Sequence, residues 1–268
     1  MKRFRVLDPD LADPGAKALC ALAVMTKVPQ PGRVKTRLTP PLTPEQAAEL
    51  NKCFLRDTAV AISIASSGGL RPPKVGSARI PAGAHRAPPQ GCGIAVYTPV
   101  GAESAYIDIL PADFSLLPQR GDNFGERLYF AVEDLFKCGF GSVCLIDSDS
   151  PTVPSENFAE AVGLLSGSGD RVVLGPSDDG GYYLIGLKKP DRHLFEQIDW
   201  STERVLNQTI ERATEIGIDI RLLPTGYDVD DDASLRRLRQ ELLADKALPD
   251  IAPYTREFLA SLVGQREL

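Results

Sequence analysis

Two short, uninterrupted apolar runs constrain the fold of this chain more than any other feature. They are ALCALAVMT at residues 18–26 and SVCLI at residues 142–146. Apolar runs of this length, without alternating polar residues, are typical of strands that are buried on both faces of a sheet. Both runs end abruptly in polar and charged residues, so each predicted strand leads into an exposed loop. The pattern predicts an α/β protein whose sheet is covered on both sides.

Helical segments separate these strands from further strand-like runs. A helix is predicted from residue 44 to about residue 66, because Thr43 suits an N-cap and Pro44 suits the first helical position. Further helices are predicted at 123–138 with Asp122 as N-cap, at 155–166, at 201–216, and from about 231; further strands are predicted at 94–98, 171–174, 182–187 and 220–223. Alternation of strands and helices indicates a mostly parallel sheet, in which ligands bind at the carboxyl ends of the strands.

The chain divides into three expected parts. Residues 1–17 are predicted to form an irregular extension, residues 18–246 a single domain, and residues 247–268 a C-terminal tail. Within the domain, residues 68–93 are dense in proline and glycine. This composition predicts an irregular insertion or lid, because such a segment has few side chains that can build a core.

The composition argues against several classes of protein. A net charge of −6 is unlike the basic excess that nucleic-acid-binding domains use to displace counterions from phosphates. No apolar run reaches the roughly 20 residues that span a bilayer. Asp8, Pro9 and Asp10 interrupt the basic N-terminus before an apolar signal segment can form. The five cysteines show no CxxC spacing, so neither a zinc site nor a disulfide framework is expected, and we expect a cytoplasmic protein.

Asp147 and Asp149 directly follow the second buried run. Two carboxylates at the end of a strand can share a divalent cation, and Mg²⁺ needs few protein carboxylates because water and phosphate oxygens complete its shell. The alternative is a simple turn, since Asp, Ser and Pro favour turns. The position after a buried strand favours the metal site.

The loop after the first strand combines glycine with positive charge. Gly32 allows close approach of the backbone to a ligand. Four cationic side chains lie within eleven residues: Lys27, Arg33, Lys35 and Arg37. Such a loop can cradle phosphates, although the Walker A pattern is absent. The alternative is a solvated basic loop, and its place beside the expected ligand cleft favours phosphate binding.

Three later segments supply further candidates. Adjacent glycines at 180 and 181 permit a tight turn before Tyr182, in which Asp179 could form a hydrogen bond with a sugar hydroxyl or a base, although a hairpin turn explains the glycines equally well. Four acidic residues lie at 228 and 230–232, more than a helix cap requires, so Asp228 or Asp230 could complete the metal site or orient a polar substrate group. Trp200 could pack beside a substrate or fill a gap.

These motifs occur together in one order, which makes the set more specific than any single motif. The set comprises KVPQPGRVKTRL at 27–38, GER at 125–127, DSDSP at 147–151, DGGYYLIG at 179–186, WST at 200–202 and DVD at 228–230. The chain resembles a bacterial family of uncharacterised glycosyltransferase-like proteins, also labelled selenodomain-associated transferases, in the nucleotide-diphospho-sugar transferase superfamily. The resemblance covers roughly residues 18–240, and more distantly the basic loop resembles that of guanylyltransferases acting on 2-phospholactate or the molybdenum cofactor.

The resemblance implies a GT-A-type, Rossmann-like fold with a mixed sheet. It also implies that Asp149 is the acid next to the metal and that the loop at 27–37 faces the nucleotide. The family more often has glycine at the position of Asp147, so Asp149 is the principal metal-ligand candidate. Asp147 and Asp230 are the additional metal candidates, with Mg²⁺ or Mn²⁺ as the cofactor.

Three functional hypotheses follow from this resemblance and these residues. The first is a metal-dependent glycosyltransferase that uses a nucleotide-sugar donor and a small-molecule acceptor, with Asp149 and Asp179 as catalytic residues. In this hypothesis Gly180, Gly181, Tyr182 and Trp200 lie on the substrate side. The second is a nucleotidyltransferase that activates a small phosphorylated substrate, and the third is a nucleotide-binding protein without catalytic activity. Fold alone does not separate the three.

Overall fold

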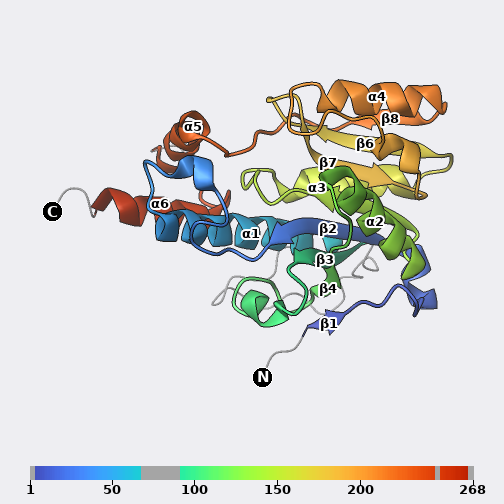
Figure 1. Cartoon of the computed structure of the whole chain (residues 1–268), viewed down its shortest axis with the longest axis horizontal. Helices are drawn as coiled ribbons and strands as arrows, with labels where there is room; N and C mark the ends of the chain where they lie inside the picture. Colours follow the sequence, from blue (N-terminus) through green and yellow to red (C-terminus); the bar gives the residue numbers. More distant parts are fainter. Residues whose placement is uncertain (1–3, 68–90, 245–247, 265–268) are drawn as a thin grey trace, which may run out of the picture.

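The computed structural model describes residues 4–67, 91–244 and 248–264 of the chain. These residues form an eight-stranded sheet with helices packed around it (Figure 1). The strands are β1 (Arg5–Val6), β2 (Cys20–Lys27), β3 (Gly91–Thr98), β4 (Ser115–Pro118), β5 (Ser142–Ile146), β6 (Arg171–Pro176), β7 (Tyr182–Leu187) and β8 (Asp219–Leu222). The α-helices of the described residues are α1 (Pro44–Ser66), α2 (Phe124–Lys137), α3 (Ser155–Ser166), α4 (Val205–Glu215), α5 (Asp232–Leu243) and α6 (Pro253–Gly264).

The sheet is mixed and mostly parallel, with the strand order β1-β4-β3-β2-β5-β7-β6-β8. Strand β2 lies near the middle and pairs in parallel with β3 along its full length and with β5 on its other side. Strand β7 is antiparallel to both of its neighbours, β5 and β6. The predicted α/β fold class, with a mixed sheet of GT-A type, is therefore confirmed.

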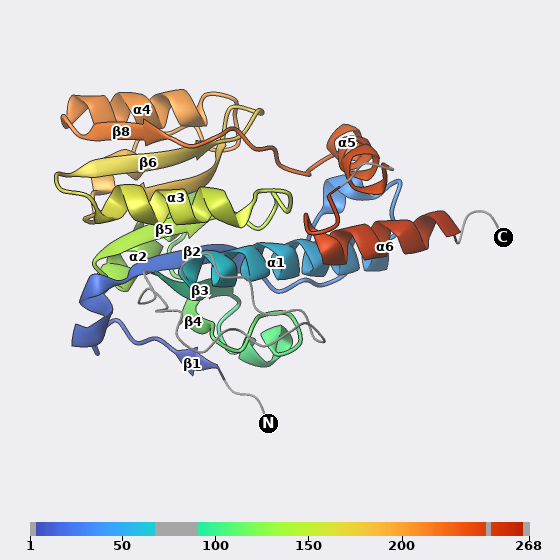
Figure 2. The same ribbon diagram turned by 180° about the vertical axis from the view of Figure 1, so that it is seen from behind.

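The two faces of β2 explain why its sequence is apolar throughout. Cys20, Leu22 and Val24 face a core that includes residues of α1 and α3. Ala21 and Ala23 face the opposite core, which includes residues of α2 and α4. Seen from behind, α3 lies over the near face of the sheet and α2 over the far face (Figure 2). A strand covered on both sides has no face on which polar side chains would remain hydrated, so both sets of side chains are apolar.

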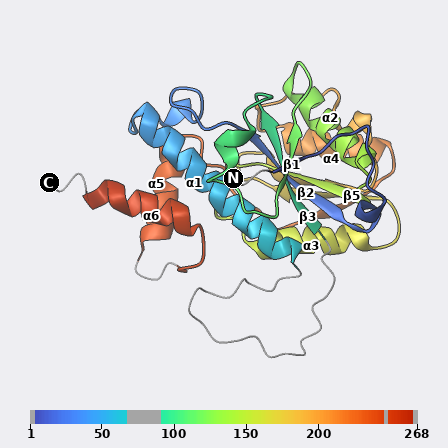
Figure 3. The same cartoon turned by 90° about the horizontal axis from the view of Figure 1, so that it is seen from below.

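Helix α1 extends beyond the sheet, and its first half belongs to a third cluster with α5 and α6 (Figure 3). Leu50 and Phe54 of α1 are buried there against Leu238 of α5 and Leu259 of α6. Helix α6 lies in residues 247–268, the segment predicted to be a C-terminal tail. Helix α6 packs on α1 because this contact buries the apolar side of α6.

Several predicted boundaries match the structure, and others are corrected. Thr43 caps α1 in a capping box with Gln46, as predicted from its sequence. Helix α2 is capped by Asn123, whose side chain accepts a hydrogen bond from the backbone of Glu126, so the prediction of Asp122 as the cap is wrong. Helix α4 begins at Val205 rather than at residue 201, because residues 201–204 form turns instead.

The ends of the predicted insertion and extension differ from expectation as well. Residues 68–90 of the predicted insertion lie outside the described residues, but residues 91–93 belong to β3. A Cβ at position 93 would lie 2.5 Å from the Phe114 ring, so the close packing of this ring on β3 requires glycine there. Within the predicted extension, Arg5–Val6 form an edge strand that pairs with β4. No helix of the described residues is both long and apolar enough to cross a membrane.

Candidate functional site

Four loops meet at one edge of the sheet because of the strand directions. The loops after β2, β5, β6 and β8 all leave the carboxyl ends of strands, and antiparallel β7 begins at that same edge. Between them lies a pocket of about 690 Å³. The predicted site residues that line it are Lys27, Arg33, Lys35, Arg37, Asp147, Asp149, Asp179, Gly181, Tyr182, Trp200 and Asp230. Gly32 and Gly180 are not among the lining residues and shape the adjoining turns.

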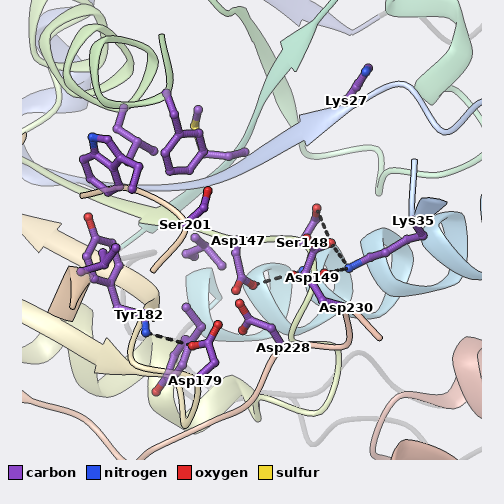
Figure 4. A pocket seen from close by; sticks show the side chains of 18 of the residues that line it. Lys27, Lys35, Asp147, Ser148, Asp149, Asp179, Tyr182, Ser201, Asp228 and Asp230 are labelled. Atoms are coloured by element: carbon purple, nitrogen blue, oxygen red, sulfur yellow. Dashed lines mark hydrogen bonds and ion pairs between the residues drawn. The ribbon is translucent and has the colours of Figure 1, made fainter. Parts of the chain in front are cut away.

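The pocket contains an ion-paired cluster around Lys35 (Figure 4). The Lys35 Nζ lies 2.9 Å from Asp149 Oδ1 and 2.8 Å from Asp230 Oδ1, and it also donates to the carbonyl oxygen of Val229 at 2.8 Å. The Lys35 side chain is only 5% exposed. Burial acts to lower the pKa of Lys35, but the charges of Asp149 and Asp230 outweigh it, so its pKa lies above the ordinary value.

Backbone geometry brings these three side chains together. Lys35 has a left-handed conformation with φ of 47° at the start of the 3-10 helix Thr36–Leu38. The amide of Val229 donates to the carbonyl oxygen of Asp149 at 2.9 Å, which ties the loop after β8 to the loop after β5. A left-handed non-glycine residue is costly, and such conformations concentrate at functional sites. The tie between the two loops places Asp230 opposite Asp149.

Asp147 takes a different part in the site. Its carboxylate accepts hydrogen bonds from the amides of Asp149 and Ser150, at 3.2 and 3.3 Å, and so closes the turn after β5. Ser150 Oγ lies 3.0 Å from Asp147 Oδ2 and 2.7 Å from Asp228 Oδ1. Because a serine hydroxyl has only one hydrogen, it can donate to only one of these two carboxylates at a time. Burial and the neighbouring charges of Asp228 and Asp149 hold the pKa of Asp147 well above its usual range. Burial likewise raises the pKa of Asp228.

The predicted metal candidates are thus divided between two clusters. Asp149 and Asp230 converge on the Lys35 ammonium, whereas Asp147 belongs with Ser150 and Asp228. Within residues 4–67, 91–244 and 248–264, no three Asp, Glu, His or Cys side chains group closely enough to hold a metal ion. The oxygens around Lys35 Nζ are two carboxylates and one carbonyl, which is the donor chemistry that Mg²⁺ and Mn²⁺ accept. These three oxygens are therefore of the type that a divalent cation accepts, and in this structure the Lys35 ammonium lies between them.

The turn between β6 and β7 carries Asp179 into the pocket wall. Asp179 Oδ1 accepts a hydrogen bond from the amide of Gly181 at 2.9 Å. Gly180 has a φ of 90°, and a Cβ there would lie 2.2 Å from the carbonyl oxygen of Glu203. Glycine is required at 180 because the turn lies directly against the segment that leads into α4.

One prominent residue of the pocket wall, Phe124, is not among the candidates predicted from the sequence. Phe124, the first residue of α2, is exposed and lines the pocket, with its ring 5.2 Å from the ring of Trp200. A large aromatic at the start of a helix, directly after polar capping residues, is the local signal that could have revealed it. Met25 and Leu128 also line the pocket and add apolar surface to it.

Comparisons with known proteins agree with the observed architecture. Residues 88–202, less than half of the chain, match a family described as "uncharacterized protein conserved in bacteria (DUF2064)". No curated protein matches the chain. A solved structure described as a "putative nucleotide-diphospho-sugar transferase" from Desulfovibrio desulfuricans is 24% identical, covers 91% of this chain and 95% of its own, and has a TM-score of 0.73.

Two further solved structures are much less similar. A cytidylyltransferase from Leptospira borgpetersenii is 10% identical over 92% of this chain and 94% of its own, with a TM-score of 0.49. Glucosyl-3-phosphoglycerate synthase from Mycobacterium tuberculosis is 12% identical over 94% and 82%, with a TM-score of 0.45. These two similarities are too weak to carry an argument about function. The chain therefore has the fold of the Desulfovibrio protein, and its own chemistry has to be inferred from the pocket.

Proposed function

We propose that the chain is a transferase that binds a nucleotide-linked donor, and that it transfers a glycosyl group from a nucleotide-sugar to a small-molecule acceptor. The observation that carries this proposal is the pocket at the carboxyl edge of the sheet. There a carboxylate pair, Asp149 and Asp230, lies beside the cationic loop at 27–37. Carboxylates that can hold a cation, next to side chains that can neutralise phosphates, suit a diphosphate leaving group.

In this proposal Asp149 and Asp230 would hold Mg²⁺ or Mn²⁺, with Asp147 shaping the turn that presents Asp149. The metal would supply positive charge to offset the charge that develops on the leaving diphosphate. For this to happen Lys35 would have to release the two carboxylates, and its ammonium would then be available to the phosphate oxygens. Arg33, Arg37 and Lys27 add charge along the same wall, since all three line the pocket.

Asp179 is the proposed partner of a sugar or acceptor hydroxyl. Its Oδ1 accepts from Gly181, so the carboxylate has a fixed orientation at the pocket wall. Acceleration would come mainly from holding donor and acceptor in line and from fixed charges around the leaving group. No covalent intermediate is needed for this role.

Nucleotidyl transfer is the second candidate, and the density of cations favours it. Four Lys and Arg side chains of one loop line the pocket, which would suit a triphosphate as well as a diphosphate. In this reaction an oxygen of a phosphorylated substrate attacks the α-phosphorus of a nucleoside triphosphate, and the bond to pyrophosphate breaks. The transition-state charge lies on phosphoryl oxygens, so the contacts from the loop become essential.

Binding and turnover experiments separate these candidates. Thermal shift and calorimetry with Mn²⁺ compare nucleoside diphosphates, nucleotide-sugars and nucleoside triphosphates. Binding of the diphosphate and its sugar conjugate, but not of the triphosphate, would exclude nucleotidyl transfer. Release of a nucleoside diphosphate during turnover supports glycosyl transfer, and release of pyrophosphate supports the second candidate. Tight nucleotide binding without any turnover across an acceptor panel points to the non-catalytic protein.

The Asp149→Ala variant tests the role of the carboxylate. We expect loss of Mn²⁺-dependent nucleotide binding, because half of the carboxylate pair that fits the cation is removed. Asp219→Ala, in the edge strand β8 and away from the pocket, is the matched control. Calorimetry that gave the same affinity for Asp149→Ala and for the unmodified protein would refute the metal assignment.

A further inference from the structure

Three aromatic side chains that line the pocket, Phe124, Tyr182 and Trp200, are called here the aromatic corner. Tyr182 lies on the other side of Asp149 from Lys27 and Lys35 (Figure 4). The Phe124 and Trp200 rings meet edge to face, with centroids 5.2 Å apart and an interplanar angle of 75°. Phe124 is 54% exposed although it lies at the wall of a pocket. Trp200 is partly buried against the core, so the exposed face of Phe124 and the accessible part of Trp200 together offer an apolar surface to a ligand.

The backbone is built to hold Trp200 in this place. Gly125 is buried against it, and a Cβ at 125 would lie 2.6 Å from the indole Nε1. Ser201, the next residue after Trp200, has a φ of 65°, in the left-handed region that non-glycine residues rarely adopt. The left-handed backbone of Ser201 and the space left by Gly125 together hold the Trp200 indole in one orientation.

Charge is distributed unequally along the pocket. Lys27 and Lys35 lie on one side of Asp149, whereas Asp179, Tyr182 and Ser201 lie on the other (Figure 4). A phosphate is attracted to the lysines and repelled by the Asp179 carboxylate. A ligand with a charged and a neutral part is therefore oriented, with its phosphates at the loop and its neutral part at the aromatic corner.

We propose that the aromatic corner is the binding subsite for a neutral sugar ring. The C–H bonds on one face of a pyranose make that face apolar, so it can lie against Phe124 and Trp200. The ring hydroxyls then lie within reach of the carboxylate of Asp179 and the hydroxyl of Ser201, which also line the pocket. This inference rests on the proposed glycosyl transfer, and the ring belongs either to the donor or to the acceptor.

The chain has one tryptophan, and it is Trp200, so tryptophan fluorescence reports on this corner alone. The probes are UDP, GDP, ADP and CDP, their glucose or mannose conjugates, and methyl glucoside and methyl mannoside, all with Mn²⁺ present. If the ring belongs to the donor, a sugar conjugate changes the emission and its parent diphosphate binds by calorimetry without changing it. If the ring belongs to the acceptor, the methyl glycoside changes the emission of the diphosphate complex instead.

Two results would overturn the subsite. One is a full emission change with a nucleoside diphosphate alone, which would place the base at the corner. The other is unchanged emission with every sugar-containing probe. The test also separates this inference from the proposed function. If calorimetry detects no nucleotide, the proposed function fails, and the methyl glycosides titrated alone still decide whether the corner takes a sugar.

A variant pair tests the contact by calorimetry. Phe124→Ala should weaken binding of the sugar-containing ligand about threefold to tenfold, as expected for the loss of one aromatic face, and leave the parent diphosphate unaffected. Leu222→Ala, an equally exposed apolar residue outside the pocket, is the control. Trp200→Phe retains a ring and should have a smaller effect than Phe124→Ala. Equal weakening of diphosphate and conjugate would indicate a general disturbance and contradict the subsite.

Discussion

At the scale of single residues, Lys35 is the group on which the site depends most. Its ammonium occupies the point where the carboxylates of Asp149 and Asp230 converge. A positive charge fixed at this point competes with any metal ion for the same oxygens. In the proposed function the same ammonium also contacts the phosphates of the donor. Lys35 is therefore expected to have opposite effects on the binding of metal and of nucleotide.

The Lys35→Met variant should show both effects. We expect Mn²⁺ alone to bind about tenfold more tightly, because the competing cation is gone, and a nucleoside diphosphate to bind at least about tenfold more weakly, because a charged hydrogen-bond donor is lost. Calorimetry measures both affinities. Lys27→Met removes a lysine from the same pocket without touching the carboxylate pair and should leave the Mn²⁺ affinity unchanged. Weaker Mn²⁺ binding by Lys35→Met would contradict this role.

Gly180 sets the position of the turn that carries Asp179. Alanine at 180 combines a φ of 90° with a Cβ 2.2 Å from the carbonyl oxygen of Glu203, so the backbone has to move. We expect Gly180→Ala to lower the free energy of unfolding by about 1–3 kcal/mol, measured by urea denaturation. Gly163 lies in α3, and a Cβ at this position would have no atom within 4 Å. Gly163→Ala should therefore raise the free energy of unfolding by roughly 0.5–1 kcal/mol. Equal effects of the two changes would refute the backbone argument.

At the scale of elements, α6 is attached to α1 through a buried carboxylate. Asp57 of α1 accepts hydrogen bonds from the amides of Tyr254 and Thr255, at 3.1 and 2.9 Å, and from the Thr255 hydroxyl at 2.6 Å. Burial is the main cause that raises the pKa of Asp57 to about 6, and the hydrogen bonds from Thr255 oppose it only in part. The docking of α6 should therefore depend on pH.

The direction of this dependence follows from the raised pKa. The carboxyl group of Asp57 binds its proton more tightly in the folded state than in the unfolded state. Protonation of Asp57 therefore makes its full contribution to the free energy of unfolding below about pH 4, and this contribution is lost as the pH rises through about 6. Relative to Asp57→Asn, the unfolding free energy of the unmodified protein should fall by at most about 3 kcal/mol over this range. Urea denaturation at several pH values measures the difference. A constant difference, or one that rises with pH, would contradict the prediction.

Local signals predicted the elements well where a cap or an apolar run defined them. The Thr43 cap of α1 and the apolar run of β5 both coincide with the structure. Prediction failed where glycine or polar residues enter regular structure, as at residues 91–93 of β3, because their local preferences favour loops. The pairing of β3 with β2 along eight residues outweighs those preferences.

At the scale of the whole molecule, stability is concentrated in the middle of the sheet. Strand β2 is paired on both sides and covered by helices on both faces, whereas β8 pairs with β6 at the edge and most of its residues are exposed. Native-state hydrogen exchange should therefore be slowest for the β2 amides and much faster for those of β8. Mass spectrometry of peptides covering 20–27 and 219–222 checks this. Equal protection of the two strands would show that the molecule opens only as one unit.

The sequence alone determined the kind of elements, the fold class and the loops that carry the candidate residues. These follow from local patterns, because an apolar run or a helix cap acts over a few residues. Only the tertiary structure decided how the acidic residues divide, with Asp149 and Asp230 meeting Lys35 and Asp147 joining Asp228 through Ser150. It also decided that Phe124 faces Trp200. The partners in these contacts are far apart along the chain, and the strand order that brings them together is not encoded in any local pattern.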